Sequence, residues 1–149
     1  MIALVPLKQL DAAKSRLGEV LDDEQRHALA LRLLTRVIDA CQGAGLDVAI
    51  VSSDPLAYIA SLERVLDLGP ERLITGHFDP VDGADLIAEE ITAMRDAMIW
   101  VHDRTVDGMN AGADVHTLMR EVRVPEHLDV GEGYGHTAWN VRAIWEQYA

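Results

Sequence analysis

Two short apolar runs, separated by a long amphipathic segment, set the strongest constraint on the fold of this chain. Residues 2–5 and 48–51 each have the length and composition of a buried strand. Between them, apolar residues recur at helical spacing from Leu29 to Cys41, after an acidic first turn that suits the positive end of a helix dipole. A strand, a helix and a strand in this order predict a parallel pair with a right-handed crossover.

The same order continues along the chain. Asp54 followed by Pro55 predicts the start of a second helix, and residues 72–75 predict a third short strand. We therefore expect an α/β fold with a small three-stranded parallel sheet, flanking helices and a helical C-terminal arm. The arm consists of three predicted helices, over residues 85–109, 114–123 and 137–148.

Charge divides the chain at residues 53 and 54. Residues 1–53 hold 6 basic and 7 acidic side chains, for a net charge of −1. Residues 54–149 hold 7 basic and 18 acidic side chains, for a net charge of −11, which brings the whole chain to −12. This break predicts two pieces, each carrying only part of a functional site.

Composition excludes several classes of partner. A net charge of −12 argues against nucleic acid, because phosphate binding needs a basic surface, and it also disfavours anionic membranes. No apolar run reaches the length of a membrane-spanning helix, and residues 1–6 lack the pattern of a signal peptide. Cys41 is the only cysteine, so no internal disulfide can form. We expect a cytoplasmic protein, with Cys41 as a small core residue.

The first candidate site follows the first strand. Lys8, Lys14 and Arg16, together with Ser15 and the loop amides, could hold a triphosphate, because cations neutralise it and backbone donors orient it. The spaced glycines of a Walker A loop are missing. From spacing alone, a solvated basic loop is the alternative.

Residues 4–8 and 12–17 resemble the opening of the 2-phospholactate or phosphoenolpyruvate guanylyltransferases, which act in deazaflavin cofactor biosynthesis. Residues 48–54 are similar to the next strand of that family and its end. The resemblance implies a nucleotidyltransferase fold, with the phosphates of Mg-GTP near Lys8 and near residues 14–16. The later acidic metal ligands and the acceptor pocket of that family have no counterpart in this sequence.

The second candidate is His77, which follows the third predicted strand. A histidine at the end of a buried strand is well placed to bind a metal ion such as zinc, although a lone histidine is more often structural.

The surrounding residues again resemble a family, the alkylsulfatase-type hydrolases with a metallo-β-lactamase fold. The resemblance is carried by residues 61–70 and 73–77, and then by residues 95–97, 102–105, 108–110, 133–135 and 139–144. It implies that His77 matches the last zinc ligand, and that the residues after it match the alkyl sulfatase dimerisation region. The main metal motif of the family, His-x-His-x-Asp-His, is absent. His102 and Asp103 are interpreted as a polar edge or interface contact, and the loop at residues 133–135 as a pocket wall or a hinge.

The long predicted helix carries a seam of its own. The seam residues are spaced 4, 3, 4, 3 and 4 apart, which is a heptad pattern; they are Ile87, Ile91, Met94, Met98, Val101 and Thr105. Such a seam packs either against its own chain or against a second copy. We expect a homodimer through residues 85–109.

Together these patterns predict two domains, a nucleotidyltransferase-like fragment at residues 1–53 and a metallo-β-lactamase-fold C-terminal fragment at residues 54–149. The chain is interpreted as a fusion of two enzyme fragments, natural or engineered; a degenerate gene product, or chance likeness in one half, would give the same pattern. Because both resembled enzymes lack their main metal-binding residues here, we expect the chain to be inactive alone. The predicted function is a non-catalytic, dimer-forming module. The alternatives are a GTP-binding guanylyltransferase-like protein, and a zinc-dependent hydrolase whose site, with His77, is completed across a dimer.

Overall fold

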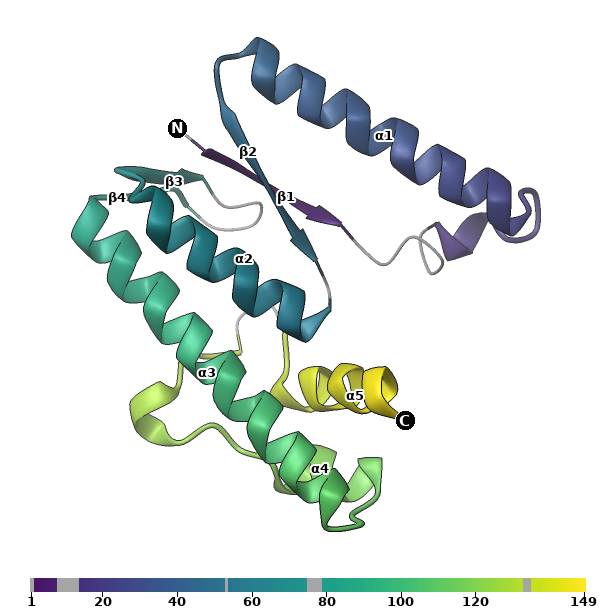
Figure 1. The fold of residues 1–149 in the computed structure, drawn as a ribbon, viewed down its shortest axis with the longest axis vertical. Coiled ribbons are helices and arrows are strands. Elements are labelled where there is room, and N and C mark those ends of the chain that lie inside the picture. Colours follow the sequence, from purple (N-terminus) through teal and green to yellow (C-terminus); the bar gives the residue numbers. More distant parts are fainter. Residues whose placement is uncertain (1, 8–13, 53, 75–78, 133–134) are drawn as a thin grey trace. The chain divides into compact units, whose positions relative to one another are not determined.

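A computed structural model describes residues 2–7, 14–52, 54–74, 79–132 and 135–149 (Figure 1). The chain divides into two compact units. The first unit contains residues 1–53 and 69–87, and the second contains residues 54–68 and 88–149. The predicted domains at residues 1–53 and 54–149 stay a prediction.

The first unit is built on a four-stranded sheet with the order β2-β1-β3-β4. β1 (Ile2–Leu7) pairs in parallel with β2 (Asp47–Ser52) along its whole length. On its other side, the beginning of β1 pairs in parallel with β3 (Arg72–Ile74), and β4 (Val81–Asp82) runs antiparallel to β3. β1 therefore lies between β2 and β3. The chain passes from β1 to β2 on one side of it and then crosses to β3 on the other side.

The expected three-stranded parallel sheet is therefore wrong, since the sheet has four strands and is mixed. Five α-helices also account for most of the residues that the structure describes. β4 has only two residues, so it has no periodicity that a sequence pattern could reveal. It is held by its pairing with β3, by an ion pair between Arg72 and Asp82, and by the Gly83 amide, which donates to the Glu71 carbonyl oxygen at 2.9 Å.

Helix α1 (Asp23–Gly43) joins β1 to β2 and contacts both strands. A capping box starts it: the Gln25 amide donates to the Asp22 carboxylate at 2.8 Å, and the Asp22 amide donates to the Gln25 side chain at 3.1 Å. These bonds satisfy amides that a helix end otherwise leaves without partners. Over its 21 residues, α1 has one buried residue, Ala30.

The second unit is helical. Its elements are α2 (Pro55–Leu68), most of α3 (Ala84–Asn110), α4 (Val115–Glu121), the short 3-10 helix η2 (Glu126–Leu128) and α5 (Thr137–Tyr148). The expected start of α2 is confirmed, because the Ala57 amide donates to the Asp54 carboxylate at 2.8 Å and Pro55 is the first helical residue.

The helices after residue 88 form a core of their own instead of the expected arm. The five core residues come from α3, from α4 and the residue after it, and from α5; they are Val101, Leu118, Val122, Val141 and Ile144. Gly108 on α3 permits this packing, because a Cβ at that position would lie 2.3 Å from Leu118 Cδ2. Four of the six seam residues of α3 are buried in the single chain, whereas Met94 is 37 % exposed.

Candidate functional site

Two of the basic residues that follow β1, Lys14 and Arg16, lie in one exposed turn. Lys14, Ser15 and Arg16 are exposed, and Ser15 begins the 3-10 helix η1 (Ser15–Leu17). Lys14 has a φ of 55° and is the one described non-glycine residue with a positive φ. A left-handed residue beside right-handed residues turns successive backbone N–H groups toward one side, and this arrangement binds anions in many loops.

Arg26 on α1 adds a third cation to this turn. Its guanidinium lies against Gly18, where a Cβ would come within 2.8 Å of Nη1. Its Nη2 donates to the Asp23 carboxylate at 2.5 Å, while its Nε is buried and has no acceptor among the described residues. The sequence analysis missed Arg26, because helical spacing does not show that the turn at Gly18 lies against it.

Two predicted site residues, Lys8 and His77, lie outside the described residues. Among the residues that the structure describes, no three His, Cys, Asp or Glu side chains gather in a group that could hold a metal ion. In the same part of the chain, no helix has the length and apolar character needed to span a membrane.

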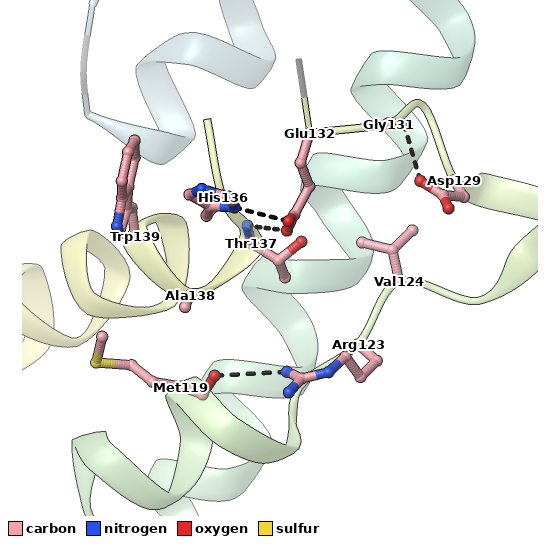
Figure 2. A pocket seen from close by; sticks show the side chains of 10 residues that line it. All are labelled: Met119, Arg123, Val124, Asp129, Gly131, Glu132, His136, Thr137, Ala138 and Trp139. Atoms are coloured by element: carbon pink, nitrogen blue, oxygen red, sulfur yellow. Dashed lines mark hydrogen bonds and ion pairs between the residues drawn. The ribbon is translucent and has the colours of Figure 1, made fainter. Parts of the chain in front are cut away.

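The second unit contains a pocket of about 560 Å³, shown in Figure 2. Its walls come from α4, from the segment after it and from the first turn of α5. The lining residues are Met119, Arg123, Val124, Asp129, Gly131, Glu132, His136, Thr137, Ala138 and Trp139. Of the predicted site residues, the three that the structure describes (Lys14, Ser15 and Arg16) do not line this pocket. The predicted pocket loop falls partly outside the described residues, at 133 and 134, and the pocket residues Glu132 and His136 flank it.

Glu132 occupies the amino end of α5. Its Oε2 accepts a hydrogen bond from His136 Nδ1 at 2.7 Å, and its Oε1 accepts one from the Thr137 amide at 2.7 Å (Figure 2). The bond from His136, with those from Thr137, lowers the pKa of Glu132 to about 2. A carboxylate is stabilised where free amides and the helix dipole point outward, so Glu132 fills the place of an anion at this helix end. The spacing of four residues between Glu132 and His136, directly before a predicted helix, is the sequence signal that could have revealed this arrangement.

The basic residue of the pocket, Arg123, is used structurally. Its Nη1 donates to the backbone oxygens of Val122 at 2.8 Å and Met119 at 3.4 Å. Its own carbonyl oxygen accepts the indole N–H of Trp100 at 3.0 Å. The bond from Trp100 holds the chain after α4 against α3, while the bonds from Arg123 fix its own side chain at the end of α4.

His102 links α3 to the end of α5. Its Nδ1 lies 3.1 Å from an Asp103 carboxylate oxygen, and its Nε2 lies 3.0 Å from the Tyr148 hydroxyl. The bond to Tyr148 makes His102 a polar contact between α3 and α5. The interpretation of His102 and Asp103 as a polar edge or interface contact stays a prediction.

Comparison with known proteins identifies two relationships. The family described as "Guanylyl transferase CofC like" matches residues 1–67. A phosphoenolpyruvate guanylyltransferase of Rubrobacter xylanophilus is 54 % identical over 70 residues, which are 46 % of this chain and 32 % of that protein.

The second relationship is to alkylsulfatases. A linear primary-alkylsulfatase of a Pseudomonas species is 32 % identical over 100 residues, or 64 % of this chain and 19 % of that protein. Among solved structures, the stereoselective inverting sec-alkylsulfatase Pisa1 from a Pseudomonas species matches with a TM-score of 0.58 and 28 % identity, over 64 % of this chain and 16 % of that one.

The chain spans less than two fifths of the length of each of these relatives. Both resemblances that the sequence analysis stated are confirmed. Residues 1–67 thus match the CofC-like guanylyltransferase family, and part of the chain is similar to alkylsulfatases.

Proposed function

We propose that the first unit binds the triphosphate of a guanine nucleotide through the turn that follows β1. The observation that carries this proposal is the exposed cluster of Lys14, Ser15 and Arg16 around a left-handed lysine. Lys14 and Arg16 would neutralise phosphate oxygens, and the amides of the turn would donate to them.

The position of the turn in the sheet supports the proposal. In open α/β sheets, ligands bind beyond the carboxyl ends of the strands, where successive connections leave in opposite directions. β1 is such a strand here, because β2 and β3 flank it and are both parallel to it. In the sequence, the turn at residues 14–17 begins seven residues after Leu7, the last residue of β1.

The match of residues 1–67 to the CofC-like family, and the 54 % identity to a phosphoenolpyruvate guanylyltransferase, favour a guanine nucleotide over other phosphates. Only binding is proposed. Nucleotidyl transfer depends on metal ions that clamp the phosphates, and this sequence has no counterpart of the later acidic metal ligands of the resembled family.

A thermal-shift measurement with Mg-GTP tests this proposal. At ten times the dissociation constant, GTP should raise the Tm by about 3–6 °C. Lys14→Ala should remove most of this rise, because a hydrogen bond to a charged group contributes about 1.5–3 kcal/mol. Arg36→Ala is the matched control: Arg36 is an exposed cation on α1, ten residues beyond Arg26, and its loss should leave the rise unchanged.

Two results would remove the proposal. One is a Tm that does not move with GTP at millimolar concentration. The other is an equal loss of the shift in Lys14→Ala and Arg36→Ala, which would indicate binding to diffuse positive charge instead of the turn.

For the second unit, we propose a structural role in which α3 pairs two copies of the chain. The similarity to alkylsulfatases and the exposure of Met94 on the α3 seam favour it. Because most of the seam is buried in the single chain, this contact has to use the exposed side of α3. A Met94→Glu variant should lower the dimer fraction measured by light scattering. Leu86→Glu is the control, because Leu86 is an exposed apolar residue of α3 outside the seam. A wild-type chain that scatters as a monomer at every concentration would contradict this role.

A further inference from the structure

Strand β2 (Asp47–Ser52) forms one edge of the sheet in the first unit. It pairs with β1 on one side, and no described strand pairs with it on the other. Exposed edges are normally protected by proline, lysine or a bulge, because their free N–H and C=O groups can form hydrogen bonds with the edge of another strand. β2 has neither proline nor lysine, its register with β1 runs without a break, and its one charged residue is Asp47.

We propose that the free edge of β2 pairs in antiparallel fashion with β2 of a second copy of this chain, so that two four-stranded sheets become one. This interface differs from the α3 contact proposed above, and it uses only residues of the first unit.

Charge permits this self-pairing. In an antiparallel pair related by a twofold axis through the sheet, residues directly opposite each other point to the same face. At the centre of the pair, a residue of one copy therefore lies opposite the same residue of the other copy. In the six-residue strand β2, the two registers that pair the most residues are centred on Ala49 and on Ile50. In the first register, Asp47 lies opposite Val51 of the other copy, and in the second it lies beyond the end of the paired strand. Like charges, which destabilise a pair when directly opposite, do not meet in either register.

The spacing of the helices also fits. α1 contacts both β1 and β2, so it packs against this pair of strands. Neighbouring strands lie about 4.8 Å apart, so a helix centred over its pair would lie about 10 Å from the α1 helix of a second copy joined at β2. Packed helices prefer separations of about 8–10 Å. The twofold axis puts both α1 helices on the same face of the joined sheet, so pairing of the strands would also bring the two helices into contact.

One side of α1 has apolar residues for this contact. Ala30 is the buried residue of the helix. In a right-handed crossover, residues about 100° further round the helix than Ala30 lie on the side of β2 that faces away from β1. Leu31 is in that position and is 41 % exposed. Leu34 and Ile38, three and seven residues further on, continue the stripe and are half-buried. Leu33, which is 38 % exposed, lies on the opposite margin.

Hydrogen exchange and light scattering on the full chain test the proposal together. In a Met94→Glu background, which weakens the α3 contact, we expect the β2 amides that do not bond to β1 to become protected as the protein concentration rises, in step with a doubling of the mass. Leu31→Glu should weaken the dimer about tenfold or more, which corresponds to one lost apolar contact of about 1.4 kcal/mol. Leu33→Glu is the matched control and should leave the dimer affinity within about threefold, because it makes the same change on the other side of the helix.

Far-UV circular dichroism serves as the check that both variants keep their helices. The proposal is overturned if the chain stays monomeric at all concentrations. It is also overturned if the mass doubles while β2 exchange is independent of concentration, since the dimer then forms elsewhere. Equal weakening by Leu31→Glu and Leu33→Glu would likewise contradict it.

Discussion

Helices α1 and α5 show how differently the two units are built. α1 is 21 residues long and has one buried residue, Ala30. α5 is 12 residues long and buries both Val141 and Ile144 completely. Most of the stability of a helix in a protein comes from packing of its apolar face rather than from its length. The second unit therefore contains a closed core, whereas the first unit exposes apolar helix surface that a further element could cover.

The two units also differ in what they offer to an anionic ligand. The first unit carries an exposed basic turn, and the second carries a pocket whose anion position is occupied by its own Glu132. The first unit thus offers an exposed position for an anionic ligand, whereas in the second unit the comparable position is filled by the chain itself.

The largest effect is expected from a cavity in the core of the second unit. Ile144→Ala should lower the free energy of unfolding by about 3–4 kcal/mol, because it leaves a cavity at a side chain that is 0 % exposed. Leu33→Ala on α1 should cost less than about 1 kcal/mol, because Leu33 is already partly in water. Urea unfolding of both variants measures the difference. Equal losses would show that the two helices are packed alike.

A smaller effect separates two helical glycines. Gly108→Ala should destabilise the chain by about 1 kcal/mol net, since the clash with Leu118 outweighs the better helix propensity of alanine. At Gly43, near the end of α1, a Cβ would meet nothing within 4 Å, so Gly43→Ala should be neutral or slightly stabilising. Thermal unfolding of the two variants side by side compares them. A gain of stability at Gly108 would mean that Leu118 can move aside freely.

The third prediction concerns pH and Glu132. The pKa of Glu132 is lowered to about 2 in the folded chain, chiefly by the bond from His136, so its charged form stabilises the fold above its ordinary pKa of 4.5. This contribution is lost as the pH falls from about 4.5 to 2. Wild type should therefore be more stable than Glu132→Gln at neutral pH, and the two should converge as the pH approaches about 2. Unfolding series at stepped pH measure this, and a gap that stays constant down to pH 2 would contradict it.

The smallest effect is expected at the ion pair between Arg72 and Asp82. The bond lowers the pKa of Asp82 and raises that of Arg72, but both side chains are more than half exposed. Exposed pairs contribute little and are screened by salt. Asp82→Asn should therefore change the Tm only slightly, and the change should vanish at high ionic strength. A large change that persists in salt would show that β4 depends on this pair.

The sequence patterns predicted the helices better than the sheet and the site. The last helix was predicted at residues 137–148, its observed bounds, because its apolar residues repeat strongly and a glycine-rich loop precedes it. Asp54 and Asp114 marked helix starts correctly, since a carboxylate that caps free amides is a local signal. β4 was missed because two residues have no period.

The site could be predicted only in its local part. Lys14, Ser15 and Arg16 are adjacent in sequence, and the structure describes them as one turn. Arg26 joins that turn through the contact with Gly18, which depends on how the chain folds back and leaves no mark in spacing. The pocket beside α5 likewise requires α4 and α5 to meet, a long-range contact that no single motif encodes.

The bond from the Trp100 indole to the Arg123 carbonyl oxygen has a spectroscopic consequence. All three tryptophans of the chain, at positions 100, 139 and 145, belong to the second unit, and the first unit has none. Intrinsic fluorescence therefore reports the second unit alone, with Trp100 sensitive to the release of the chain after α4, whereas circular dichroism also detects α1. Coincident denaturation curves from the two methods would mean that the units unfold as one cooperative body. Separate curves would mean that the first unit, which circular dichroism detects and fluorescence does not, unfolds in a transition of its own.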